Sequence, residues 1–234
     1  MKLLAVETST DACSAALYID GIVSERFELT PKEHTKLILP MIDSLMSEAG
    51  LRPQQLNALA FSCGPGSFTG VRIATGVIQG IAMGADLPVV PVSTLAAIAQ
   101  GFFYKNKIEA NNSECNVAFT AMDARMGEIF WAVYERDEQN FARLLGKESV
   151  VPATDVDFPA IRGVGIGSGW GVYNQELMTR LSTQVRSYEI DHLPGAGAIA
   201  CLGVQGYQQG LAVPVEQAMP VYLRDKVAKK ESER

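Results

Sequence analysis

A glycine turn at residues 64–66 carries the residue types best suited to holding an anion. It follows an apolar strand predicted over residues 59–63 and precedes a helix predicted from Thr69 to about Met83. Glycine reaches backbone angles closed to other residues, and Ser67 or Thr69 can cap the helix by accepting a bond from its free N–H groups. Such a turn at a helix N-terminus can bind phosphate. No Lys-Ser or Lys-Thr pair follows the glycines, so the segment is not a Walker A loop. A plain strand-to-helix corner is the alternative interpretation.

Residues that could form a catalytic centre are few and far apart. The chain has two histidines, His34 and His192, and four cysteines without a CxxC pair. Protein metal sites combine several such ligands at short spacings, so we expect no metal site. Ser67, His192 and Asp123 could be combined into a triad on paper, but the G-x-S-x-G nucleophile elbow is missing. The residues alone therefore predict no catalytic set.

Two acidic turns are the remaining polar candidates. Glu7 and Asp11 could orient a metal-bound nucleotide through water, or Glu7 could serve only as a cap or partner within its own turn. Asp123 and Arg125 lie on a turn in the second half of the chain, and we expect them to form a local ion pair.

The bulk composition limits the class of protein. The hydrophobic share of 47% and the charged share of 20% are ordinary for a globular protein. A net charge of −6 argues against a chain that grips nucleic acid unaided, because phosphate contacts dominate such affinity. The isolated cysteines suggest a reducing compartment. The first seven residues are too short in their apolar run, and too soon acidic, for a signal peptide, so we expect a cytoplasmic protein.

The elements that would position these groups alternate between strand and helix. Asp20-Gly21 predicts a tight hairpin between two of three opening strands. An amphipathic helix with Pro40 inside it follows the i, i+3, i+4 pattern of apolar residues. The predicted order is strands 2–8, 14–19 and 21–29, helix 33–49, strand 59–63, helix 69–83, strand 87–92 and helix 94–103.

The sequence pattern of the second half predicts a repeat of this plan. The expected elements are strands 116–122, 128–135 and 141–145, a glycine-rich strand over 163–169, and helices 172–181 and 196–209. A polar stretch at 105–114 looks like a linker. We therefore predict an α/β protein with a duplicated fold, divided into a lobe at 1–104, a second lobe at 105–213 and a C-terminal tail at 214–234.

The helix after the glycine turn has an unusual face. Gly76, Gly80 and Gly84 recur every four residues and so lie along one side. Each costs about 1 kcal/mol relative to alanine, and close approach of another backbone is the usual compensation. That backbone could belong to the same domain or to a partner protein. A membrane span is not expected, because Arg72 and Gln79 interrupt a stretch that is already short.

Several motifs together resemble a known family. The acidic-hydroxyl turn after the first strand, within an alternating duplicated plan, resembles the actin, sugar kinase and Hsp70 superfamily. Within it, the chain resembles the TsaB (YeaZ) family over nearly its whole length. The motifs are LAVETSTD at 4–11, His34 followed by LILP at 37–40, GPGSFTGVR at 64–72 and PVYLRD at 220–225.

The resemblance implies a duplicated actin-like fold with two small βββαβαβα-type lobes. In that superfamily, the turn after the first strand and its counterpart in the second half cradle nucleotide phosphates. It therefore implies weak nucleotide candidates at Thr8, Ser9, Thr10, Gly165, Gly167 and Gly169. Alternating glycines also serve simply for tight packing of a strand on a helix. Since no Walker-type lysine completes the site, we expect no cofactor beyond weak ATP or ADP binding.

Family members are bacterial partners of TsaD in making threonylcarbamoyladenosine beside the tRNA anticodon. The resemblance thus implies a non-catalytic subunit that activates a TsaD-like enzyme, with a TsaE-like ATPase in a larger complex, tRNA contact only through the complex, and no membrane. TsaD carries two metal-binding histidines four residues apart on a helix, whereas residues 92–100 here have none. The implied partner face, which could also form a homodimer, comprises His34, Ile38, Met41, Ile42, Leu45, Gly76 and Gly80.

Two other functions stay open. Relatives have been described as glycoproteases, so an autonomous metal-dependent hydrolase is one alternative. A small-molecule kinase-like protein that binds ATP in the cleft between the lobes is the other. The first needs a metal pair or triad, and the second needs a catalytic aspartate facing the γ-phosphate.

Overall fold

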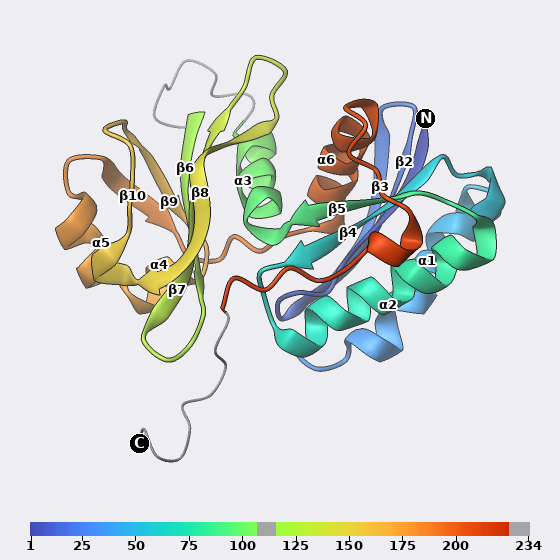
Figure 1. Cartoon of the computed structure of the whole chain (residues 1–234), viewed down its shortest axis with the longest axis horizontal. Coiled ribbons are helices and arrows are strands. Elements are labelled where there is room, and N and C mark those ends of the chain that lie inside the picture. The colour runs from blue at the N-terminus through green and yellow to red at the C-terminus, as the bar shows by residue number, and fades with distance from the viewer. Residues whose placement is uncertain (107–115, 225–234) are drawn as a thin grey trace.

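The computed structural model describes residues 1–106 and 116–224, which form two lobes side by side (Figure 1). The first lobe is built on a five-stranded sheet with the order β3-β2-β1-β4-β5. β1, β2 and β3 are antiparallel neighbours, while β4 runs parallel to β1 and β5 runs parallel to β4. The strands are β1 (Lys2–Glu7), β2 (Ala12–Ile19), β3 (Ile22–Leu29), β4 (Ala58–Gly64) and β5 (Val89–Ser93).

The second lobe repeats the arrangement with the order β10-β9-β6-β7-β8. Its three antiparallel strands and its two parallel strands follow one another as in the first lobe. The strands are β6 (Val117–Asp123), β7 (Glu128–Arg136), β8 (Ala142–Pro152), β9 (Gly163–Ile166) and β10 (Val185–Glu189). The matching strand orders confirm the predicted duplicated α/β fold.

The outer face of the first sheet is covered by α1 (His34–Glu48) and α2 (Phe68–Ala85). Pro40 lies inside α1, as predicted. The apolar stripe of α1 packs on β2 and α2 packs on β4, and together they bury one hydrophobic core. The predicted hairpin is also present, with Asp20 and Gly21 at positive φ between β2 and β3.

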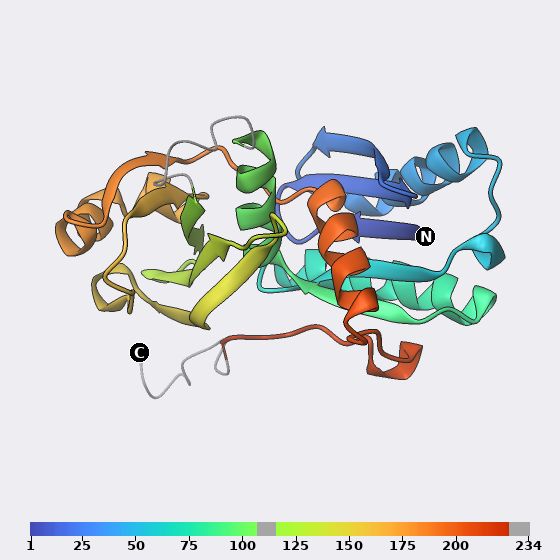
Figure 2. The same ribbon diagram turned by 90° about the horizontal axis from the view of Figure 1, so that it is seen from above.

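The last helix of each lobe packs on the other lobe's sheet. α3 (Thr94–Lys105) follows β5 in sequence, yet its side chains Leu95, Ile98 and Phe102 share a core with the second sheet. α6 (Ala196–Gln208) follows β10 and instead packs on β1, β2 and β4. The two helices contact each other between the lobes, as both views show (Figures 1 and 2). The predicted boundaries, 1–104 and 105–213, put each helix with the strands before it. In the structure the apolar faces of these two helices pack on the opposite sheets, so that each helix joins the two lobes.

The C-terminal segment is more than a tail in the described residues. Val213 pairs with Val89 on β5 through two backbone hydrogen bonds of 2.9 and 2.8 Å. The Gln79 amide donates to the Ala218 carbonyl at 2.9 Å, and Val221 N donates to Cys63 O at 2.7 Å. The segment therefore runs along the first lobe and then reaches the second (Figure 2). Of the predicted tail, residues 225–234 lie outside the described part.

Several element boundaries differ from the prediction. β8 extends to Pro152, and β10 was missed because its sequence VRSYE is mostly polar and exposed. The helix expected at 172–181 is α4 (Gly169–Val172) followed by α5 (Asn174–Leu181). Short 3₁₀ helices occur at Pro53–Gln55, Ala153–Asp155 and Val215–Gln217. Eight residues of the predicted linker, 107–114, lie outside the described part. Among the described residues, no helix combines the length and apolar character needed to cross a bilayer.

Candidate functional site

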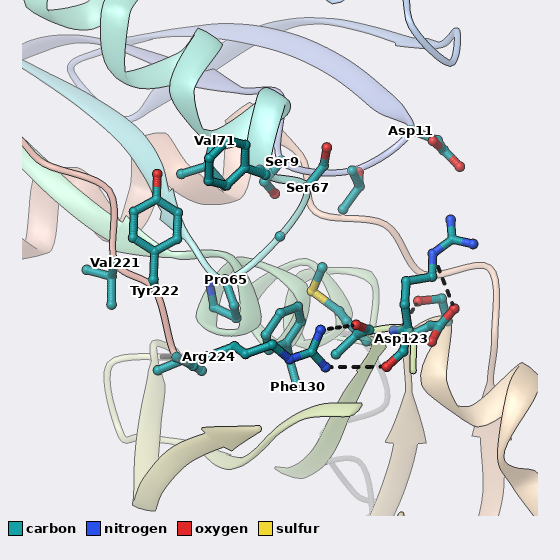
Figure 3. A pocket seen from close by; sticks show the side chains of 18 of the residues that line it. Ser9, Asp11, Pro65, Ser67, Val71, Asp123, Phe130, Val221, Tyr222 and Arg224 are labelled. Atoms are coloured by element: carbon teal, nitrogen blue, oxygen red, sulfur yellow. Dashed lines mark hydrogen bonds and ion pairs between the residues drawn. The ribbon is translucent and has the colours of Figure 1, made fainter. Parts of the chain in front are cut away.

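A cleft of about 550 Å³ lies between the lobes (Figure 3). The first lobe contributes the turn after β1, the glycine turn at 64–66 and the start of α2. The second lobe contributes the β6–β7 turn and Ser168, while residues 221–224 of the C-terminal segment line one side. Of the six residues that the resemblance implied as weak nucleotide candidates, Ser9 and Thr10 line this cleft.

On the first-lobe side, two of the predicted hydroxyl residues line the cleft. Ser9 and Thr10 are among its walls, whereas Thr8 is fully buried and donates its hydroxyl to Gly70 O at 2.7 Å. The Ser67 side chain caps α2 by accepting from Gly70 N at 3.4 Å, as predicted. The Ser67 N–H is already committed to Ser9 O at 2.7 Å. One of the amides that an anion would need is thus occupied by the protein itself.

Glu7 does not face the cleft. Its side chain is fully buried, and its Oε1 accepts a hydrogen bond from Ser9 N. Among the described residues, neither its Oε2 nor the Ser62 hydroxyl forms a hydrogen bond of good geometry, although Ser62 lies near enough to lower the pKa of Glu7 slightly. Burial raises the pKa of Glu7 from 4.5 to about 7, since water no longer solvates the carboxylate, although the hydrogen bonds from Ser9 lower it. The arrangement supports the interpretation in which Glu7 serves its own turn.

On the second-lobe side, the predicted ion pair is present. Arg125 Nε lies 3.8 Å from Asp123 Oδ2, and Arg125 N donates to Asp123 Oδ1 at 2.8 Å. Both residues line the cleft, which therefore has a carboxylate on each side, Asp11 and Asp123. Arg125 and Arg224 also line the cleft, but each is engaged by the protein, Arg125 with Asp123 and Arg224 with Glu128.

The three predicted glycines of the second lobe are packing residues in the structure. A Cβ on Gly165 would lie 2.4 Å from the Trp170 indole, and one on Gly167 or Gly169 would lie within 3 Å of Ala121. Only Ser168 between them lines the cleft. The glycines allow β9 and α4 to approach β6 closely, the alternative that the sequence left open.

The C-terminal segment makes contacts at the cleft that the sequence analysis did not predict. Arg224 Nη1 donates to Ala124 O at 2.9 Å, and Nη2 pairs with Glu128 Oε2 across the β6–β7 turn. The dashed lines at Arg224 in Figure 3 mark its hydrogen bonds to the backbone oxygens of Ala124 and Arg125, which join the C-terminal segment to the second lobe. Tyr222 lies beside Phe68, with ring centroids 5.9 Å apart, and Arg72 Cζ lies 3.2 Å from the Phe68 centroid. Residues 222–224 were noted only as part of a family motif. The tyrosine and the arginine that follow Pro220 were the sequence feature from which these contacts could have been predicted.

Neither histidine is placed to hold a metal with other ligands. His34 is buried, with Nε2 2.8 Å from Thr10 O and 3.1 Å from Ala12 O. His192 Nδ1 lies 3.7 Å from Glu189 Oε2, and burial lowers the pKa of His192. Within residues 1–106 and 116–224, no three His, Cys, Asp or Glu side chains gather in a metal-binding group.

The apolar residues of α1 that were predicted to meet a partner lie in the protein's own core. Ile38, Met41, Ile42 and Leu45 are between 1% and 8% exposed and pack beneath the helix. Their wide arc is explained by contacts with both the sheet and α2. The prediction of these four residues, and of buried His34, as surface contacts is therefore wrong for this conformation.

The glycine ridge of α2, defined as Gly76, Gly80 and Gly84, is open. A Cβ built on any of the three would meet no atom within 4 Å. All three residues are exposed, and Met83 beside them is 74% exposed. The ridge therefore does not serve close packing within the described chain.

Comparison with known proteins supplies the biological setting. The family model described as "TsaD: tRNA N6-adenosine threonylcarbamoyltransferase" matches residues 5–232. The tRNA threonylcarbamoyladenosine biosynthesis protein TsaB of Escherichia coli is 41% identical over 97% of this chain and 96% of its own. The protein of the same name from Haemophilus influenzae is 37% identical over 97% of this chain and 95% of its own.

A solved structure agrees with these relatives. YeaZ from Pseudomonas aeruginosa is 39% identical, with a TM-score of 0.84 over 95% of this chain and 99% of that one. At this identity and coverage, the two proteins share the same overall fold.

Proposed function

Since the chain belongs to the TsaB (YeaZ) family of tRNA threonylcarbamoyladenosine biosynthesis proteins, we propose that it is the non-catalytic subunit that binds and activates a TsaD-like transferase. It acts in the cytoplasm as a scaffold, contacts tRNA only through the complex, and joins a TsaE-like ATPase there. In the partner's absence it pairs with itself.

The open glycine ridge is the observation that carries this proposal. Gly76, Gly80 and Gly84 cost about 1 kcal/mol each relative to alanine, and no contact in the described fold offsets that cost. A ridge without side chains lets a second helix approach until the backbones nearly touch. A partner helix laid along α2 would use the ridge in this way.

The other helix of the predicted interface then has a supporting role. The buried stripe of α1 fixes α2 on the sheet, so that the ridge presents a rigid surface. Rigidity favours binding, because little conformational entropy is lost on association. The interface that we propose is centred on α2 and excludes the buried α1 side chains.

The test is a bulky residue on the ridge. Gly80→Leu should remain folded by circular dichroism yet lose co-purification with the TsaD-like subunit and self-association by size-exclusion chromatography. Gly171→Leu is the matched control, because it adds the same side chain to an exposed turn of α4 in the second lobe. A folded Gly80→Leu protein with unchanged affinity for the partner would refute the ridge as the contact.

The non-catalytic role has its own test. The isolated chain should show negligible threonylcarbamoyl transfer and negligible peptidase activity, whereas the reconstituted complex should transfer. Stoichiometric metal in the purified chain, with activity that a chelator abolishes, would favour the hydrolase alternative.

Nucleotide binding in the cleft is proposed to be weak. The Ser67 amide is occupied, carboxylates lie on both sides, and the two arginines that line the cleft, Arg125 and Arg224, are paired with Asp123 and Glu128. Calorimetry with ATP and ADP should give dissociation constants weaker than about 1 μM, or roughly −8 kcal/mol. Tighter binding accompanied by ATP turnover would favour the kinase-like alternative.

A further inference from the structure

A second hollow, of about 610 Å³, lies on the opposite side of the first sheet from the glycine ridge. Its walls come from the edge strand β3, the end of α3 and the first turns of α6. β3 pairs only with β2 in the described structure, so its other edge is open. The hollow is large enough for a small organic molecule or a long side chain.

Aromatic side chains dominate the walls of this hollow. Tyr18, Phe27, Tyr104 and Phe141 line it, and several glycines keep it wide. Glu25 is the one charged residue among the described lining residues, and no lysine, arginine or histidine accompanies it. Aromatic faces carry negative electrostatic potential, so the rings and the Glu25 carboxylate would both attract a positively charged group.

The Glu25 carboxylate is held in place by the start of α6. Its Oε1 accepts a hydrogen bond from Gly197 N at 2.8 Å. A Cβ on Gly195 would lie 2.8 Å from that oxygen, so glycine is needed for the approach. Glu25 is exposed at the sheet edge, but partial desolvation of its carboxylate beside α6 raises its pKa, and the neighbouring Arg26 pairs with Glu48 instead. The site has a fixed negative group without a cation of its own.

We propose that this hollow binds an organic cation: an ammonium or guanidinium group carried on an apolar body. The apolar body would contact the rings, and the cationic group would reach Glu25 while the rings stabilise its charge. An anion would meet the carboxylate and the negative ring faces, and a neutral apolar molecule would leave the carboxylate unpaired. The site is independent of the glycine ridge and of the role proposed above.

The same chemistry has two sources that the structure allows. One is a free amine, and the other is a lysine or arginine side chain on an extended segment that pairs with the open edge of β3. Val23, Glu25 and Phe27 alternate toward the hollow, so a segment along this edge would place its own side chain beside them.

The test titrates the full-length chain with 2-phenylethylammonium and with the peptide acetyl-Val-Lys-Val-amide, followed by the amide resonances of Gly197 and Ala198. The neutral counterparts are 2-phenylethanol and the norleucine peptide. We expect the cations to bind at least about tenfold more tightly than their counterparts. Tighter binding of the lysine peptide identifies a side-chain ligand, and tighter binding of the amine identifies a free cation.

Variants locate the binding. Glu25→Gln keeps an oxygen for the Gly197 amide and should weaken cation binding about tenfold, and Phe27→Leu should weaken it less. Glu28→Gln, on the same strand but outside the lining, should leave it unchanged. Thermal unfolding confirms that each variant is folded. Equal binding of cation and neutral counterpart, unchanged binding by folded Glu25→Gln, or no shifts at millimolar concentration would overturn the proposal.

Discussion

Each face of the first sheet is covered by a helix rich in glycine, but the glycines of α6 pack against the sheet and the ridge glycines of α2 face away from it. On one face α6 places Gly203 and Gly206 directly against the sheet. A Cβ on Gly203 would lie 2.6 Å from Ala60 Cβ, and one on Gly206 would lie 2.8 Å from Val90 Cγ1. These glycines let the helix lie close to the strands.

On the other face α2 turns its three ridge glycines away from the sheet, although Gly70 at its first turn packs against Thr8. A Cβ added at Gly76, Gly80 or Gly84 would meet no atom within 4 Å, and the Gln54 amide donates to Gly84 O at 3.4 Å. The comparison teaches that a glycine face indicates close approach without saying by whom. For α6 the approaching surface is the chain's own sheet, and for α2 we propose another protein.

The largest expected effect comes from adding the same side chain to both helices. Gly203→Leu should overpack the contact with Ala60 and Leu3 and destabilise the chain by at least about 3 kcal/mol. Gly80→Leu should leave stability unchanged or raise it by up to about 1 kcal/mol, because leucine is the better helix former. Urea denaturation followed by circular dichroism measures both. Comparable destabilisation by the two substitutions would break the comparison.

On the sheet face that α6 covers, buried Glu7 predicts that the stability of the chain depends on pH. The residue continues the positions Leu3 and Ala5, which share a core with α6. Its pKa is raised to about 7, so the protonated form is favoured by folding. The stability that this group contributes is present below pH 4.5, its unfolded value, and is lost as the pH rises through about 7. The total loss is about 3 kcal/mol.

Glu7→Gln tests this linkage. The variant should lack the decline, so that its advantage over the original chain grows between pH 5 and 8 in urea denaturation series. Glu138→Gln, at an exposed position, is the control for a general change of charge. Parallel stability curves for the original chain and Glu7→Gln would show that Glu7 is not desolvated as described.

The smallest expected effect comes from adding a single methyl group at the ridge. Gly76→Ala and Gly84→Ala should each stabilise the isolated chain by about 1 kcal/mol, since the added methyl group meets open space. Thermal unfolding checks this, and affinity for the TsaD-like subunit should fall in parallel. Gly206→Ala in α6 is the opposite control and should lower the unfolding temperature, because Val90 must move. Destabilisation by Gly76→Ala would mean that the ridge is packed.

Local sequence signals predicted most of the strand and helix plan. The Asp20-Gly21 hairpin, the Ser67 cap and the ion pair of Asp123 with Arg125 all depend on residues close in the chain. The family motifs identified the family correctly. β10 was missed because its side chains are largely exposed and polar, so that no periodicity marks it.

The site was predictable in part. Ser9 and Thr10 do line the cleft, but Arg224 reaches it only because the C-terminal segment first pairs with β5 and β4. From the sequence Gly165 was a plausible residue of a nucleotide-binding loop, but in the structure the Trp170 side chain occupies the space next to it. Contacts of this kind join distant segments, and local pattern cannot anticipate them.

The sequence by itself determined which residues share a face, because the helical and strand periods are properties of the local backbone. It set the ridge of α2, the apolar stripe of α1 and the small-residue face of α6. Only the tertiary structure decided what each face meets: the core for Ile38 and Leu45, the opposite lobe's sheet for α3 and α6, and open space for Gly80. The physical reason is that burial depends on which non-local surfaces fit together, and that fit is settled by the packing of the whole chain.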